Sequence, residues 1–203
     1  MNVRPWLVGC VMLLGSLGPV FSAAAFDADQ TFAKGTFVIS GEGSYGTQFN
    51  FEGFNDSDLK TLSVGLRGSI LPFGAAGPGF VHGAFETGLE ALYQRYLDPH
   101  TAFWAGALAV FRYHFLSLGR VVPYVELGGG FGGTDLKVRE IDSDVSFMLW
   151  GGVGASVFVT NTTAVYASYR YQHNSNSNID SPNRGVESHQ VVFGVSYYLR
   201  RAR

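Results

Sequence analysis

The sequence contains little cysteine and little charge, and each shortage excludes a class of protein. Its single cysteine is Cys10, so no disulfide can form within the chain. Charged residues make up 15% of the chain, whereas soluble domains average about 25%. The formal net charge is -2, which argues against a nucleic-acid partner because such partners bind strongly basic surfaces.

Long apolar runs are also missing from most of the chain. After residue 25 there is no apolar stretch of about 18 residues, the length that a transmembrane helix requires. A helical membrane protein is therefore excluded. A closed β-barrel is the other structure that can satisfy its backbone hydrogen bonds inside a bilayer.

Glycine and aromatic residues, by contrast, are plentiful. The chain has 27 glycines, and 15% of its residues are aromatic. Disordered chains are rich in charge and poor in aromatics, so disorder does not fit. The composition is typical of an all-β protein with one face in a non-aqueous medium.

The N-terminal segment predicts export. Arg4 precedes an apolar stretch over residues 6–17, and three alanines at 23–25 provide a cleavage site. These are the parts of a signal peptide, so residues 1–25 are expected to be removed. Residues 26–203 then form a single outer-membrane barrel domain.

Cys10 offers one alternative. Residues 7–10 read Leu-Val-Gly-Cys, which resembles the lipidation signal of a lipoprotein. Most of the apolar run follows this cysteine instead of preceding it. We therefore favour cleavage after Ala25.

Apolar and polar residues alternate along most of the remaining chain, as in strands with one apolar face. Each alternating segment approaches or exceeds the length of about 9–11 residues that a tilted membrane strand needs. The fold predicted is all-β, an eight-stranded antiparallel up-and-down transmembrane β-barrel. Its strands are expected at residues 35–46, 59–71, 80–96, 101–115, 122–133, 145–159, 164–176 and 186–199.

The polar face of these strands carries charge. Side chains fill the interior of an eight-stranded barrel, so we predict a plug of paired, hydrogen-bonded charges. Catalytic carboxylates or a channel lining are the alternatives. The residues concerned are Glu42, Arg67, Glu86, Glu90, Arg112, Glu126 and Arg170.

Three polar residues near the C-terminus lie on the other face. The apolar stripe from Val165 to Tyr171 continues to His173, and Ser175 follows on the same parity. The apolar stripe of the last strand continues back to Glu187. Side chains directly opposite each other on antiparallel strands lie about 4.5–5.5 Å apart. We therefore expect His173 and Glu187 to pair on the lipid-facing surface.

These residue types fit a hydrolase. Ser175 can act as nucleophile, His173 as its general base, and Glu187 as the carboxylate that orients the imidazole. Asn176 or a backbone N–H of the adjacent loop can donate to the oxyanion. The chemistry requires neither a metal nor another cofactor.

Ser175, His173 and Glu187 lie where the last two strands meet their connecting loop, and we call this the active-site corner. Its depth in the membrane suggests the substrate. With both termini periplasmic, the loop between the last two strands is extracellular, so the corner meets the outer leaflet. Lipid A of lipopolysaccharide supplies acyl esters there. One alternative is a non-enzymatic barrel, structural or adhesin-like, whose loops at 47–58 and 134–144 bind a partner. Another is an esterase that acts on other acyl lipids.

The same region resembles the lipid A 3-O-deacylase family of outer-membrane enzymes. Its motif reads Tyr169-Arg170-Tyr171-x-His173-x-Ser175-Asn176, followed by Pro182-Asn183-x-Gly185-x-Glu187. The resemblance implies an eight-stranded barrel in the bacterial outer membrane. It also implies a His-Ser-Glu triad facing lipid and an oxyanion hole that includes the Asn next to the Ser. The expected partners are lipid A and outer-membrane lipids, and a second copy of the chain in a homodimer is a further candidate. Ser177 and Asn178 depart from the small apolar residue and the glycine common in the family.

Overall fold

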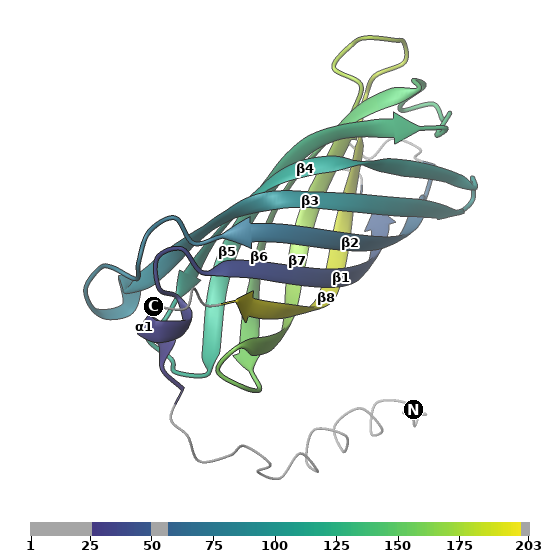
Figure 1. The fold of residues 1–203 in the computed structure, drawn as a ribbon. Helices are drawn as coiled ribbons and strands as arrows, with labels where there is room; N and C mark the ends of the chain where they lie inside the picture. The colour runs from purple at the N-terminus through teal and green to yellow at the C-terminus, as the bar shows by residue number, and fades with distance from the viewer. Residues whose placement is uncertain (1–25, 50–56, 200–203) are drawn as a thin grey trace, which may run out of the picture.

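The computed structural model of the chain is a closed barrel of eight antiparallel strands (Figure 1). It describes residues 26–49 and 57–199, so the predicted signal peptide lies outside the described residues. Each strand pairs with the next, and β8 pairs with β1 to close the barrel. The strands are β1 Phe37–Gln48, β2 Lys60–Ile70, β3 Gly83–Asp98, β4 Ala102–Phe115, β5 Val121–Thr134, β6 Val145–Phe158, β7 Thr163–Ser175 and β8 Val186–Leu199. The predicted fold class is confirmed.

A short helix lies at one end of the barrel, where β1 begins and β8 ends (Figure 1). This helix, α1 (Ala28–Thr31), begins at Asp27, whose side chain accepts a hydrogen bond from the backbone N–H of Gln30. Directly after it, Phe32 is fully buried against Phe158 and Tyr198. The lead-in segment therefore closes this end of the barrel with an aromatic cluster. No helix in the described part of the chain is long and apolar enough to cross a membrane.

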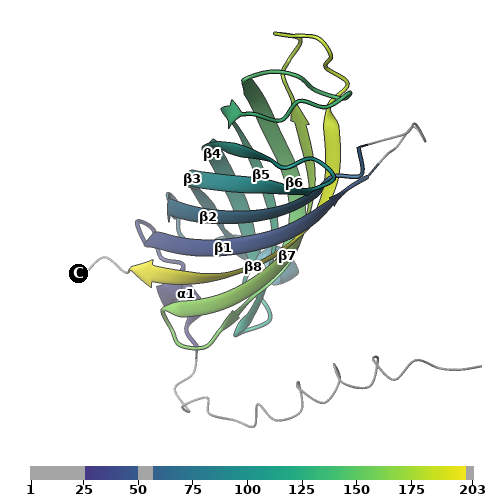
Figure 2. The same cartoon turned by 90° about the vertical axis from the view of Figure 1, so that its right-hand side faces the viewer.

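The β5–β6 loop (residues 135–144) and the β7–β8 loop (residues 176–185) project from the opposite end (Figure 2). We call this the loop end. The two loops run side by side and are joined by an isolated β-bridge between Ile141 and Asn183. Their contact places the β5–β6 loop beside the predicted active-site corner.

Alternation separates the two faces of the barrel wall. Apolar side chains such as Leu66, Leu89 and Phe193 point outward and are more than 60% exposed (63, 68 and 64%). On the opposite parity, Arg67, Glu90 and Val192 point inward and are buried. A largely apolar exterior of this kind is unfavourable in water and favourable in lipid.

The interior contains the predicted plug of paired charges. Arg112 contacts Glu126 at 2.7 Å, and Arg170 bridges Glu126 (2.9 Å) and Glu42 (3.0 Å). Arg67 contacts Glu90 at 3.2 Å. Buried charges are tolerated when they are paired and hydrogen-bonded. Each of these charges faces a partner of opposite sign, although Arg67 Nε and Nη2, Glu90 Oε1 and Arg112 Nη1 are buried without a hydrogen bond to any described residue.

Two details differ from the sequence prediction. Residues 80–82 were expected to open the third strand, but Phe80 and Val81 lie in a 3-10 turn, η2 (Gly79–Val81). Gly77 and Gly79 take positive φ values of 97° and 55°, which turn the chain before β3 begins. Helix α1 has no counterpart among the predicted elements, since four residues are too few for a periodic signal.

The plug predicts that removing a buried arginine lowers the free energy of unfolding far more than removing an exposed lysine. Arg170→Leu should lower the free energy of unfolding by about 3–5 kcal/mol, because Glu42 and Glu126 lose a partner that they share inside the barrel. Lys60→Leu removes an exposed pair with Asp98 and should cost less than about 1 kcal/mol. Urea unfolding in lipid vesicles measures both. Equal effects would contradict a stabilising plug.

Candidate active site

His173 and Glu187 lie directly opposite each other on β7 and β8. Both side chains point away from the barrel interior and are partly exposed, at 34% and 25%. His173 Nδ1 lies 3.0 Å from Glu187 Oε1. A carboxylate accepts hydrogen bonds, so Nδ1 donates to it and the lone pair of Nε2 is left free to act as a base.

Ser175 is the last residue of β7 and shares the outward face with His173. Residues two apart on a strand are separated by about 6.5–7 Å. The Ser175 hydroxyl makes no hydrogen bond to any described residue. Catalytic hydrogen bonds in unliganded enzymes are often long and tighten when substrate binds. Ser175 therefore shares the outward face of β7 with His173, and no hydrogen bond joins the two side chains in this structure.

Asn176 has a structural task in the β7–β8 loop. Its side chain is fully buried, and its amide nitrogen donates to the carbonyl oxygen of Asp180 at 3.0 Å. Its amide oxygen accepts from the backbone N–H of Asn178, and its own backbone N–H donates to Asn183 Oδ1 at 2.8 Å. In this arrangement the Asn176 side chain holds the loop together.

Gly185 ends the β7–β8 loop against the imidazole of His173. A Cβ atom built on Gly185 would lie 2.6 Å from His173 Cε1, closer than two carbon atoms can approach. Gly185 also has a φ of 81°, in the region that favours glycine. Glycine is therefore required here by the backbone and by the histidine.

Glu140 in the β5–β6 loop is a residue that sequence reasoning missed. Its carboxylate accepts hydrogen bonds from Ser57 N at 2.8 Å, Ser57 Oγ at 2.7 Å and Gln48 Nε2 at 3.2 Å. Burial alone would raise the pKa of Glu140, but these hydrogen bonds hold it below the ordinary value of 4.5. In the sequence, Glu140 is one of four acidic residues in this loop, and no pattern distinguishes it from Asp135, Asp142 or Asp144.

An apolar groove on the outer surface leads away from His173. It has a volume of about 500 Å³. Gly129 and Gly151 form part of its floor, because neither carries a side chain toward lipid. The residues that line it are Ala109, Phe111, Leu127, Gly128, Gly129, Leu149, Trp150, Gly151, Tyr171 and His173.

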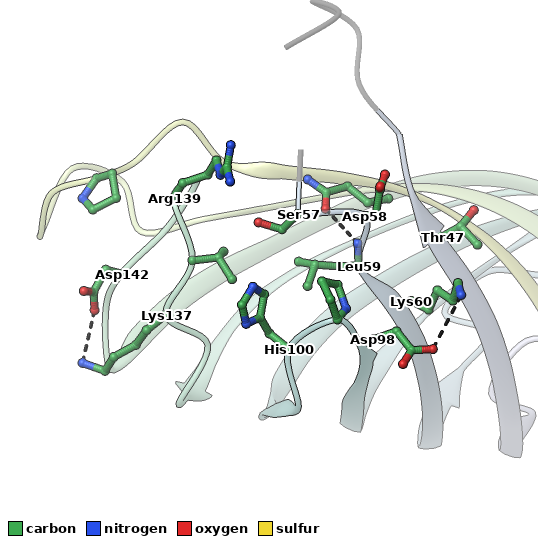
Figure 3. A pocket seen from close by; sticks show the side chains of 14 residues that line it. Thr47, Ser57, Asp58, Leu59, Lys60, Asp98, His100, Lys137, Arg139 and Asp142 are labelled. Atoms are coloured by element: carbon green, nitrogen blue, oxygen red, sulfur yellow. Dashed lines mark hydrogen bonds and ion pairs between the residues drawn. The ribbon is translucent and has the colours of Figure 1, made fainter. Parts of the chain in front are cut away.

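A second hollow opens at the loop end of the barrel, with a volume of about 1020 Å³ (Figure 3). Its charges are largely neutralised, since Lys60 pairs with Asp98 at 3.5 Å and Lys137 pairs with Asp142 at 3.1 Å. His100 lies among them (Figure 3). None of the three predicted triad residues lines this hollow. Among the described residues, no cluster of His, Cys, Asp and Glu suits a metal ion.

Comparison with known proteins decides the family. Residues 78–196 match the family described as lipid A 3-O-deacylase (PagL). The chain belongs to the PagL family. The matched region begins before β3 and ends within β8, so it contains all three residues of the predicted triad.

Solved structures agree with the fold. The crystal structure of the outer membrane enzyme PagL has a TM-score of 0.58 and 18% identity, and the match covers 75% of this chain and 97% of that one. The crystal structure of Neisserial surface protein A (NspA) has a TM-score of 0.59 and 16% identity, with coverages of 81% and 99%. No curated protein sequence matches the chain.

Membership of the PagL family places the protein in the bacterial outer membrane. It also makes the protein a member of a family of lipid A deacylases. The apolar exterior of the barrel fits this location, because it matches the hydrocarbon of the bilayer.

The lowered pKa of Glu140 predicts how the loops respond to acid. Because its folded-state pKa lies below 4.5, the stabilisation from Glu140 is complete above pH 4.5 and is lost as the pH falls through the folded value. The β7–β8 loop of the folded barrel should therefore be cut faster by an acid-active protease below that pH. Glu140→Gln, which does not titrate, should remove this acid-dependent step. A step of equal size in that variant would contradict the assignment.

Proposed function

We propose that the protein hydrolyses the 3-O-linked acyl ester of lipid A, with Ser175 as nucleophile, His173 as general base and Glu187 as the orienting carboxylate. The observation that carries this proposal is the hydrogen-bonded His173–Glu187 pair on the outward face of the barrel. A charged pair on a lipid-facing wall is unfavourable unless it lies near the interface. Its place at the loop-end edge of β7 and β8 meets that condition.

In the first half of the reaction, Ser175 Oγ attacks the carbonyl carbon of the acyl ester. His173 Nε2 takes the hydroxyl proton, and Glu187 stabilises the resulting imidazolium through Nδ1. The tetrahedral intermediate collapses by breaking the bond between the carbonyl carbon and the sugar O3. The imidazolium returns the proton to O3, which leaves as a hydroxyl.

In the second half, water attacks the acyl ester on Ser175. His173 accepts a proton from the water, and the collapse of the second intermediate releases the fatty acid and restores the Ser175 hydroxyl. Both intermediates carry a negative oxygen that needs hydrogen-bond donors. Asn176 contributes by shaping the loop, and a backbone N–H of the β7–β8 loop provides the donor.

The groove beside His173 supports an acyl substrate. Its walls are aliphatic and aromatic, and it runs over β4 to β7 on the face that meets lipid. An acyl chain that lies in this groove would bring its ester to the His173 end. With both termini on the periplasmic side, that end lies at the outer leaflet, where lipid A is found.

The first test removes the nucleophile. Ser175→Ala should lower the release of 3-O-linked fatty acid from purified lipid A by at least about 10³-fold, while the refolded barrel keeps its gel mobility. Ser177→Ala, a nearby serine in the exposed loop, serves as the matched control and should keep wild-type activity. Mass spectrometry of the lipid measures the product. Undiminished release by Ser175→Ala would sink the proposal, and preferential cleavage of phospholipid would redirect it to another acyl lipid.

The second test narrows the groove. A Cβ on Gly151 would meet only the side-chain tip of Leu127, at 3.3 Å, so Gly151→Val should fold. It should lower kcat/KM for long acyl chains by about tenfold, because the added methyl groups displace part of the chain. Ala91→Val is the control, since Ala91 is also exposed on the outer face but lies on β3. Equal rates for the two variants would show that the groove does not hold the substrate.

A further inference from the structure

Glu140 joins three segments that are far apart in the sequence. Its carboxylate accepts three hydrogen bonds from Gln48 and Ser57, on the two sides of the β1–β2 connection. Its side chain is buried. Two carboxylate oxygens with three donors around them form a fixed junction, because a carboxylate can accept from several directions at once.

The backbone of Glu140 continues this junction to the active-site corner. Its carbonyl oxygen accepts from Arg184 N at 2.7 Å and from Gly185 N at 3.2 Å. Gly185 is the residue that packs against the His173 imidazole. A second link runs parallel to the first, since Asp142 N donates to the carbonyl oxygen of Pro182 at 3.3 Å.

We propose that Glu140 is a positioning residue for the lipid A hydrolysis proposed above. It fixes the backbone of Arg184 and Gly185 against His173, so that the imidazole keeps the orientation in which Nδ1 faces Glu187 and Nε2 is free. The inference rests on the proposed function. It assigns a role to the β5–β6 loop that the triad itself does not require.

The arrangement of His173 explains why such a residue is needed. The imidazole lies at the edge of the barrel, with lipid on one side and a loop on the other. Its hydrogen bond to Glu187 restrains one ring nitrogen, while Gly185 limits the rotation of the ring. Without the Glu140 junction, the end of the β7–β8 loop loses its link to the β1–β2 connection. Small misplacements of a catalytic group lower rates steeply.

The experiment measures kcat and KM for lipid A deacylation by refolded variants. Glu140→Ala should lower kcat by about 10- to 100-fold and leave KM within about twofold, because the groove is untouched. Glu140→Gln should restore most of kcat, since its amide can still accept from Ser57 N and bond to Ser57 Oγ. Ser57→Ala removes one donor to the carboxylate and should give a smaller loss in the same direction.

Asp144→Ala is the matched control, because Asp144 is an exposed acid of the same loop whose side chain pairs with Lys137 at 3.6 Å. It should keep wild-type kcat. A wild-type kcat in Glu140→Ala, or an equal loss in Asp144→Ala, overturns the inference. If Glu140→Ala fails to fold, Ser57→Ala decides, and an unchanged kcat there overturns it. If the wild-type protein itself releases no fatty acid, the proposed function fails first and the positioning role fails with it.

Discussion

The closed hydrogen-bonded ladder is the constraint on which the rest of this structure depends. In a closed barrel every strand residue points either into the interior or out toward lipid, and the two directions alternate without exception along a regular strand. Moving a residue by one position therefore transfers its side chain to a different medium. Arg170 and His173 illustrate this. They lie on the same strand at positions of opposite parity, and one joins the buried plug while the other faces the membrane.

The two sets of charges consequently do different work. Arg170 lies between Glu42 and Glu126 in the buried interior of the barrel. His173 and Glu187 use the same kind of contact at the edge of the wall, next to an open groove. The interior pairs lie inside the wall, and the hydrogen-bonded ladder of the wall holds the outer pair in register. The loop end adds the final restraint through Gly185.

Much of this could be predicted from the sequence, since alternation is a local signal. The alternation of apolar and polar residues with a period of two predicts the eight strands and the plug. It also predicts that His173 and Glu187 point outward. The start of β3 could not be predicted, because glycine turns at Gly77 and Gly79 override the apolar pattern that follows. Glu140 was also missed. Its role depends on Ser57, which is 83 positions away, and no spacing rule connects residues of two loops. The sequence offered Asn176 or a backbone N–H of the loop as the oxyanion donor, and it could not show that the Asn176 amide also bonds within the loop.

The proposed mechanism requires that Ser175 becomes acylated during turnover. The most direct measurement is mass spectrometry of the protein after incubation with lipid A and a rapid acid quench, followed by digestion. The peptide containing Ser175 should gain the mass of the released fatty acid minus water, and Ser175→Ala should show no such gain. Fatty acid release without an adduct at Ser175 in the wild-type protein, or an adduct on another residue, would contradict it.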